Sequence, residues 1–217
     1  MQLIFEQIRT GGDRNFGYLL ADREARVGVL VDPSFSPEMC VQRAVEQGIT
    51  ITHVINTHSH PDHTNGNARA LELTRAALAA HPGAPTRPAV PLTDAHDLRV
   101  GTLHLTFLHV PGHCPDHLVV HETTHRLLIT GDILFVGKVG GTATDEDARL
   151  EWDSLQRLLE WVPDEATVWP GHDYGARPSS TIDLEKKSNP FLRCRDVEAF
   201  LQVKREWPAL KQRFGLK

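Results

Sequence analysis

The alternation of apolar and polar positions predicts short strands and helices that follow one another along the chain. Runs rich in β-branched and apolar residues, bounded by Gly, Pro or Asp, are typical of strands. Such runs occupy residues 3–8, 16–20, 27–31, 51–56, 103–110, 118–121, 126–130 and 166–169. The earliest of them predict a sheet that begins with hairpins.

Two segments with helical features lie among the first strands. One runs from Ser36 to about Gln47, with Ser36 as the expected N-cap and Pro37 in the first turn. The other covers residues 67–80, which are rich in the helix formers Ala and Leu.

The C-terminal half predicts helices as well. Apolar positions spaced three or four apart indicate one over residues 146–161. From Ser179 onward the pattern favours amphipathic helices with breaks at Pro190 and Pro208. Because strands and helices are interleaved, the expected fold class is α/β or α+β in packed layers.

Length and charge narrow the classes of function. The 217 residues suit a single domain over residues 1–217, in which residues 178–217 form a short helical C-terminal appendage. A net charge of −5 without long blocks of either sign disfavours nucleic acid and acidic membranes as partners. The sequence predicts neither a membrane helix nor a signal peptide.

The counts of cysteine and histidine change the picture further. Three distant cysteines favour reduced thiols, and hence a cytoplasmic protein. Histidine is unusually frequent, at 13 of 217 residues. Because imidazole is the commonest metal ligand, this surplus directs attention to a metal site.

One segment concentrates such ligands. It reads NTHSHPDH and directly follows a predicted apolar strand. In extended backbone His58 and His60 lie on the same side, and Pro61 favours that geometry for His60. A tight turn can then bring Asp62 and His63 to a second point nearby. Crowded imidazoles repel one another when protonated, so metal binding explains the cluster better than a polar loop.

Three further ligand-type residues follow predicted strands, each directly after a glycine. They are His113 in Pro-Gly-His, Asp132 in Thr-Gly-Asp and His172 in Pro-Gly-His. Strand ends on one edge can converge, and glycine permits close approach of the backbone. The sequence therefore predicts a metal site built from several loops.

This arrangement resembles the metallo-β-lactamase-fold superfamily, whose pattern is HxHxDH followed by His, Asp and His. The resemblance spans about residues 3–190, in the order and spacing of the family. It implies an α+β fold, a four-layer αβ/βα sandwich of two mixed β-sheets flanked by helices. In that fold the metal site lies at one edge between the sheets.

The resemblance also implies roles for the candidate ligands. The matching residues are His58, His60 and His113 for one metal, Asp62, His63 and His172 for a second, and Asp132 as the bridge. These donors suit two divalent ions, with Zn²⁺ expected and Fe or Mn admitted. Water between two such ions loses a proton readily, and Asp62 is the candidate catalytic residue that orients the resulting hydroxide.

Within the superfamily the chain most resembles the hydroxyacylglutathione hydrolases (glyoxalase II). Tyr174 and Lys138 match residues that bind the thiol carrier in that family, although the loop after Asp132 and the C-terminus are shorter here. The expected reaction is hydrolysis of a small thioester of glutathione or another thiol carrier. Its thiolate, with a conjugate-acid pKa of about 8.5, leaves readily near neutral pH.

Other superfamily members are alternatives. The persulfide dioxygenases share these residue types but use one iron, held by residues matching His58, His113 and Asp132. Their Arg-Thr-Asp-Phe loop is replaced by Gly-Thr-Ala-Thr at residues 141–144. A lactonase is less favoured because Phe135 stands where the acyl-homoserine lactonases have tyrosine. A metal-binding scaffold without activity is the least favoured.

The remaining histidines are expected to be surface or hydrogen-bonded residues. They are His53, His81, His96, His104, His109, His121 and His125. The role of His117, close to His113, is left open. Cys114 is expected to be a small buried packing residue.

Overall fold

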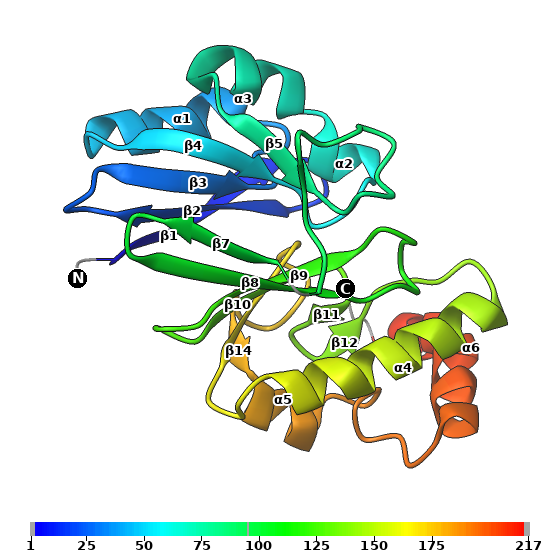
Figure 1. Ribbon diagram of the computed structural model, residues 1–217. Helices are drawn as coiled ribbons and strands as arrows, with labels where there is room; N and C mark the ends of the chain where they lie inside the picture. Colours follow the sequence, from blue (N-terminus) through cyan, green and yellow to red (C-terminus); the bar gives the residue numbers. More distant parts are fainter. Residues whose placement is uncertain (1–2, 95, 215–217) are drawn as a thin grey trace.

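Figure 1 shows the computed structural model, which describes residues 3–94 and 96–214. Two six-stranded sheets face each other, and helices cover the outer face of each. This is the predicted sandwich of two mixed sheets flanked by helices. The last three residues of the predicted C-terminal appendage, 215–217, lie outside the described residues.

The first sheet contains the N-terminal strands in chain order. They are β1 (Leu3–Gly11), β2 (Asn15–Asp22), β3 (Val27–Val31), β4 (Thr50–Ile55), β5 (Ala77–Ala80) and β6 (Val90–Pro91). β1 to β3 pair antiparallel as the predicted hairpins, and β3 to β6 pair parallel. Its helices are α1 (Pro37–Glu46), α2 (Pro61–Thr64) and α3 (Asn67–Thr74).

The second sheet has the order β14-β13-β10-β9-β8-β7. Its strands are β7 (Asp97–Val100), β8 (Leu103–His109), β9 (Leu118–Glu122), β10 (Leu127–Gly131), β13 (Thr167–Pro170) and β14 (Ser180–Thr181). β10 and β13 pair parallel, and the other pairs are antiparallel. The remaining elements are the hairpin β11 (Leu134–Phe135) and β12 (Lys138–Val139), with α4 (Asp145–Trp161), α5 (Ile182–Ser188) and α6 (Val197–Phe214).

Strand β2 shows why an apolar run becomes a central strand here. Every residue of β2 is buried, because both of its faces are covered. Tyr18 and Leu20 pack between the two sheets, whereas Leu19 and Ala21 pack on the other face together with Ala44 of α1. A strand buried on both faces carries apolar residues without strict alternation.

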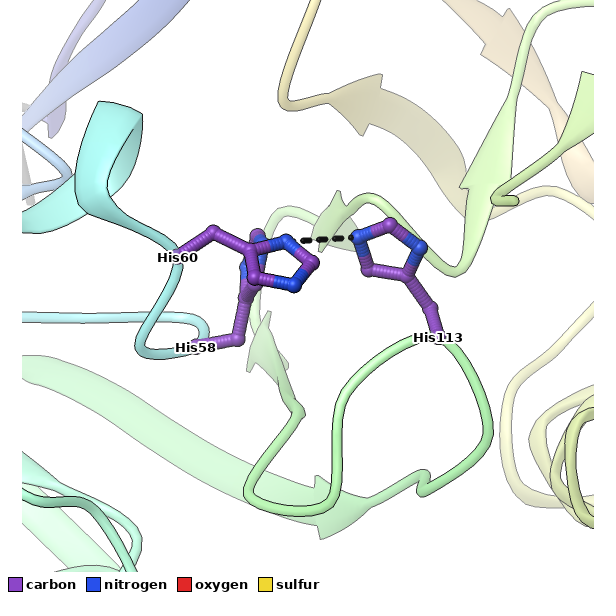
Figure 2. Close-up of side chains that lie close together, drawn as sticks. All are labelled: His58, His60 and His113. Carbon is purple, nitrogen blue, oxygen red and sulfur yellow. Dashed lines mark hydrogen bonds between the residues drawn. The ribbon is translucent and has the colours of Figure 1, made fainter. Parts of the chain in front are cut away.

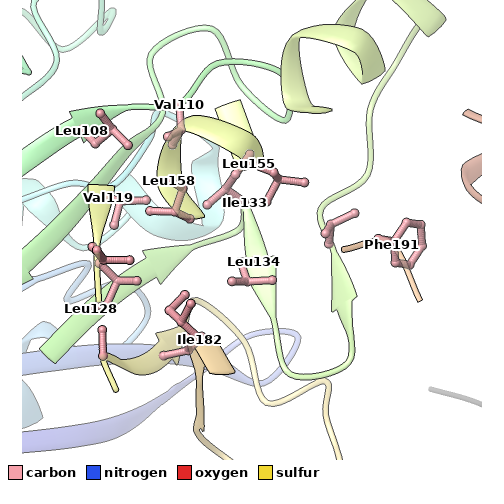
Figure 3. Packing of buried hydrophobic residues seen from close by; sticks show 14 of the residues in the cluster. Leu108, Val110, Val119, Leu128, Ile133, Leu134, Leu155, Leu158, Ile182 and Phe191 are labelled. Atoms are coloured by element: carbon pink, nitrogen blue, oxygen red, sulfur yellow. The ribbon is translucent and has the colours of Figure 1, made fainter. Parts of the chain in front are cut away.

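A third apolar cluster joins the second sheet to the C-terminal helices (Figure 3). Leu128 of β10 belongs to the same cluster as Leu155 and Leu158 of α4. Phe191 and Phe200, from the predicted appendage, belong to it as well.

Within the described residues, no helix is both long and apolar enough to cross a membrane.

The predicted helix over residues 67–80 is wrong in its second half. Helix α3 ends at Thr74, Arg75 adopts a left-handed conformation with φ of 57°, and Ala77–Ala80 forms β5. β5 pairs with β4 on one side and β6 on the other. Sheet hydrogen bonding and burial therefore override the helix propensity of Ala and Leu.

Two smaller expectations also need correction. Ser36 occupies the N-cap position, but its hydroxyl donates to the carbonyl of Thr10 at 2.7 Å and makes no cap bond. Pro208 lies inside α6 and does not end it. The missing helix bond costs about 3 kcal/mol, which the packing of neighbouring Trp207 on Phe191 helps to offset. The predicted break at Pro190 is confirmed, since it lies between α5 and α6.

Candidate metal centre

The predicted ligands follow strands from both sheets. His58 comes after β4 of the first sheet, whereas His113, Asp132 and His172 come after β8, β10 and β13 of the second. His60 has the predicted extended backbone, with φ of −58° and ψ of 141°, and the single turn of α2 then reverses the chain. The sandwich thus brings distant parts of the sequence to one site.

His58, His60 and His113 form the first group of candidate ligands (Figure 2). The Nδ1 of His60 lies 3.0 Å from the Nε2 of His58 and 3.1 Å from the Nε2 of His113. Ring nitrogens this close cannot all carry protons. At least one nitrogen of each pair must present a lone pair, and three ring nitrogens this close together could hold one cation.

Asp62, His63 and His172 form a second group. The Nε2 of His63 lies 3.2 Å from the Nε2 of His172, and the latter lies 3.4 Å from Oδ2 of Asp62. The carboxylate of Asp132 stands between the two groups. Its Oδ2 lies 3.3 Å from the Nε2 of His172 and 3.6 Å from that of His113.

The residues present fit divalent cations. The ligand atoms of His58, His63 and Asp132 make a third group, and within each group all atoms lie within 4.8 Å of one another. The buried Oδ1 of Asp132 makes no hydrogen bond with any described residue. A buried carboxylate oxygen without a donor is unusual unless it serves another partner, and a cation among imidazoles is such a partner.

The charges at the site favour a cation. Burial lowers the pKa of His58 well below its ordinary value, so this imidazole stays neutral and keeps its lone pair. Burial raises the pKa of Asp132, but the positive charge of His63 and the hydrogen bond from His172 outweigh it and hold that pKa well below its usual range. The ionised carboxylate of Asp132 therefore lies beside the neutral imidazole of His58 and beside His63 and His172, whose pKa values are raised against the effect of burial by its charge. A cation can take the place of their protons.

Asp32 is a supporting residue that the sequence analysis missed. Its Oδ1 accepts a hydrogen bond from the backbone N–H of Thr57 at 2.9 Å, and its Oδ2 accepts one from the Thr57 hydroxyl at 2.6 Å. Oδ2 also lies 3.0 Å from Nδ1 of His63. The available signal is an acidic residue directly after the strand that precedes β4 in the sequence.

His117 supports the site without belonging to any of the three ligand groups. It is fully buried, and its Nε2 accepts a hydrogen bond from the backbone N–H of Asp132 at 3.0 Å. Its ring stacks on that of His58 at 4.8 Å. Cys114 is buried, as expected, and its thiol donates to Asp116 at 2.9 Å.

Backbone carbonyls orient two of the imidazoles. The Nδ1 of His113 donates to the carbonyl of Gly141 at 2.7 Å, and the Nδ1 of His172 donates to that of Asp13 at 2.8 Å. Such outer contacts fix which nitrogen faces a metal. In both residues Nε2 is left to face the centre.

Lys138 and Tyr174 lie together beside the second group. The Tyr174 ring stacks on that of His172 at 4.6 Å, and its hydroxyl donates to Asp13 at 2.6 Å. The Lys138 ammonium lies 3.8 Å from the centre of the Tyr174 ring. Burial, together with the charge of Lys211, lowers the pKa of Lys138 to about 8.

Fold and site together define a class of protein. The model of the metallo-beta-lactamase superfamily matches residues 11–89 and 81–172. The chain belongs to this superfamily.

The similar proteins include both hydroxyacylglutathione hydrolases and persulfide dioxygenases. The chain is 37% identical over 180 residues to a hydroxyacylglutathione hydrolase of Polaromonas sp. (strain JS666), covering 79% of this chain and 67% of the relative. It is 30% identical over 193 residues to the human mitochondrial persulfide dioxygenase ETHE1, covering 87% and 75%. The crystal structure of ETHE1 from Myxococcus xanthus has a TM-score of 0.86 and 32% identity, covering 94% of this chain and 91% of that one.

Proposed function

We propose that this chain is a thioester hydrolase of the hydroxyacylglutathione hydrolase type that uses two metal ions. The observation that carries this proposal is that two complete groups of ligand atoms lie on either side of Asp132. These groups are His58, His60 and His113, and Asp62, His63 and His172. Two ions would use both groups, whereas a single iron held by His58, His113 and Asp132 would leave Asp62, His63 and His172 without a metal.

The chemistry follows from the residues around the ions. When bound, two divalent cations, Zn²⁺ in our proposal and Fe or Mn as alternatives, acidify water and polarise a thioester carbonyl. The side chain of Asp62 is 38% exposed, and its Oδ2 accepts a hydrogen bond from Nδ2 of Asn15 at 3.0 Å. This carboxylate, held by Asn15, would orient the attacking hydroxide. The leaving thiolate needs no dedicated acid.

Lys138 and Tyr174 are the proposed contacts to the thiol carrier. Lys138 and Trp207 line two cavities, of about 470 and 510 Å³, and Tyr174 lines the larger one. Lys211 adds positive charge to the smaller. Two lysines and an aromatic wall suit a carrier that bears carboxylates, such as glutathione.

The proposal is tested by measuring metal content and thioester hydrolysis on one sample, purified without added metal. We expect two metal ions per chain and cleavage of a hydroxyacylglutathione. His58→Ala should lose most of both, because its imidazole belongs to two of the ligand groups. The exposed His125→Ala is the control and should keep both. Full turnover by His58→Ala with unchanged metal content would contradict the proposal.

A second candidate is a persulfide dioxygenase with one iron. It is favoured by the fold likeness to the Myxococcus ETHE1, which extends over nearly the whole of both chains. His172→Ala separates the two functions. In the hydrolase it should remove one of two ions and thioester cleavage. In the dioxygenase, whose iron would be held by His58, His113 and Asp132, iron and persulfide-dependent oxygen uptake should persist.

We further propose that residues 1–217 form one domain, located in the cytoplasm. The packing of Phe191 and Phe200 in the same cluster as Leu155 supports the single domain. The free thiols of Cys40 and Cys114, both buried, are consistent with a reducing compartment.

A further inference from the structure

A largely buried lysine of the last helix is linked to the candidate metal centre through one short segment of chain. Lys204, on α6, donates to the backbone carbonyl of Gly140 at 3.0 Å and pairs with the carboxylate of Glu151 on α4. The two side chains are 12% and 0% exposed. An ammonium taken out of water this far is costly unless its protons are satisfied, so its partners hold it in one place.

The first partner, Gly140, precedes the residue whose carbonyl binds the candidate ligand His113. Gly140 and Gly141 begin the segment of residues 140–144 that joins β12 to α4, which we call the strap. The carbonyl of Gly141 accepts the hydrogen bond from Nδ1 of His113 at 2.7 Å. Gly140 itself lies against the imidazole, because a Cβ added to it would come within 2.8 Å of that Nδ1.

The second partner, Glu151, packs against the loop that carries His113. Gly112, the residue before His113, has φ of 135°, and its Cα packs against the backbone of Glu151 so closely that an added Cβ would lie 2.5 Å from it. One turn along α4, the hydroxyl of Ser154 donates to the carbonyl of Pro111 at 2.7 Å. The loop that carries the imidazole therefore rests on α4.

We propose that Lys204 is a positioning residue of the metal centre. By binding Gly140 and Glu151 together, it fixes the strap and the helix between which the imidazole of His113 is oriented. The inference rests on the proposed role of His113 as a metal ligand. Groups that hydrogen-bond a ligand directly typically contribute about 10- to 100-fold to metal affinity, and Lys204 acts one residue further out, through Gly140.

The test measures the affinity of the full-length protein for Zn²⁺ alone, by competition with a chromophoric chelator. Lys204→Met should weaken binding by about tenfold, the lower end of the effect of a direct ligand contact, and change the visible spectrum of the Co²⁺-loaded protein. The control is Arg149→Met, which also removes an ion pair between α4 and α6, with Glu198 at 2.7 Å, but lies on the exposed face. It should bind Zn²⁺ as the unmodified protein does.

A double variant distinguishes the loss of the positioning contact from the effect of leaving the Glu151 carboxylate buried without a partner. Lys204→Met leaves the buried carboxylate of Glu151 without its partner, whereas Lys204→Met/Glu151→Leu removes both charges. If the single variant does not fold, Zn²⁺ affinity is measured on the double variant instead. We expect the double variant to bind Zn²⁺ as weakly as the single one, since both lack the bond to Gly140. Recovery of normal affinity in the double variant would overturn the proposal.

Two other results are equally decisive. If Lys204→Met binds Zn²⁺ normally and only raises KM, the lysine is a substrate contact and the proposal fails. If His113→Ala also leaves Zn²⁺ affinity unchanged, the ligand assignment fails and the positioning role with it. Loss of affinity in His113→Ala but not in Lys204→Met would leave the proposed hydrolase intact and refute only the role of Lys204.

Discussion

The Nδ1 of His63 lies 3.0 Å from the Oδ2 of Asp32, and their side chains are 1% and 2% exposed. Burial lowers the pKa of His63, but the carboxylates of Asp132 and Asp32 outweigh that effect and raise it well above its ordinary value. The contact directs Nε2 of the imidazole to the candidate metal centre. Asp32 has φ of 45°, a conformation that non-glycine residues rarely adopt.

Replacing Asp32 should therefore weaken metal binding without touching a ligand. Asp32→Asn removes the charge that holds His63, and we expect a loss of about 10- to 100-fold in metal affinity. Metal titration monitored by chelator competition measures it. Asp183→Asn, which removes an exposed carboxylate paired with Lys187, is the matched control. Normal affinity in Asp32→Asn would show that the contact does not support the site.

Gly171 should not tolerate even one added methyl group. A Cβ at this position would collide with Oδ1 of Asp132 and lie 2.9 Å from Cε1 of His63. We expect Gly171→Ala to lose most bound metal, as measured by elemental analysis. Gly141→Ala is the control, because a Cβ there meets no atom within 4 Å. Equal metal content in both variants would refute this prediction.

Tyr174→Phe should raise KM for a thioester and leave metal content and kcat unchanged. The hydroxyl makes its bond to Asp13 and contacts no candidate ligand, so its loss removes binding that is equal in the ground and transition states. Steady-state kinetics and metal analysis check it. An unchanged KM would exclude the hydroxyl from the substrate site.

The charge of Lys138 should make carrier binding depend on pH. Its pKa is lowered to about 8 by burial and by the charge of Lys211, so the ammonium is complete below pH 7 and is lost as pH rises through 8. KM for an anionic thioester should therefore rise between pH 7 and 9. Lys138→Met should have a high KM that is flat over this range. A parallel rise in the variant would assign the pH effect to another group.

Phe200→Ala tests the proposal of a single domain. The ring is fully buried and packs at 5.4 Å from Trp152 of α4 and at 5.9 Å from Phe191. Its loss should reduce the free energy of unfolding by about 3–5 kcal/mol in one cooperative transition. Urea unfolding followed by fluorescence and by circular dichroism measures this. Two separate transitions, of which only one shifts, would indicate that the C-terminal helices unfold independently.

Much of the fold was predictable from local patterns. All eight predicted strands are present, and so are helices α1 and α4 and the break at Pro190. These features were predictable because hydrophobic periodicity and the positions of Gly and Pro act over a few residues. The segment Ala77–Ala80 was not predictable in this way. Its helix-forming composition is overridden by strand partners, one of which lies more than twenty residues earlier in the sequence.

The sequence by itself determined the set of candidate metal ligands, since seven His and Asp residues carry the pattern of the superfamily. Only the tertiary structure decided what supports them. Three supporting contacts join residues that are 15 to 64 positions apart in the sequence. They are those of Asp32 with His63, His117 with Asp132, and Lys204 with Gly140. No local pattern records such contacts, because they exist only where the two sheets and the last helix pack together.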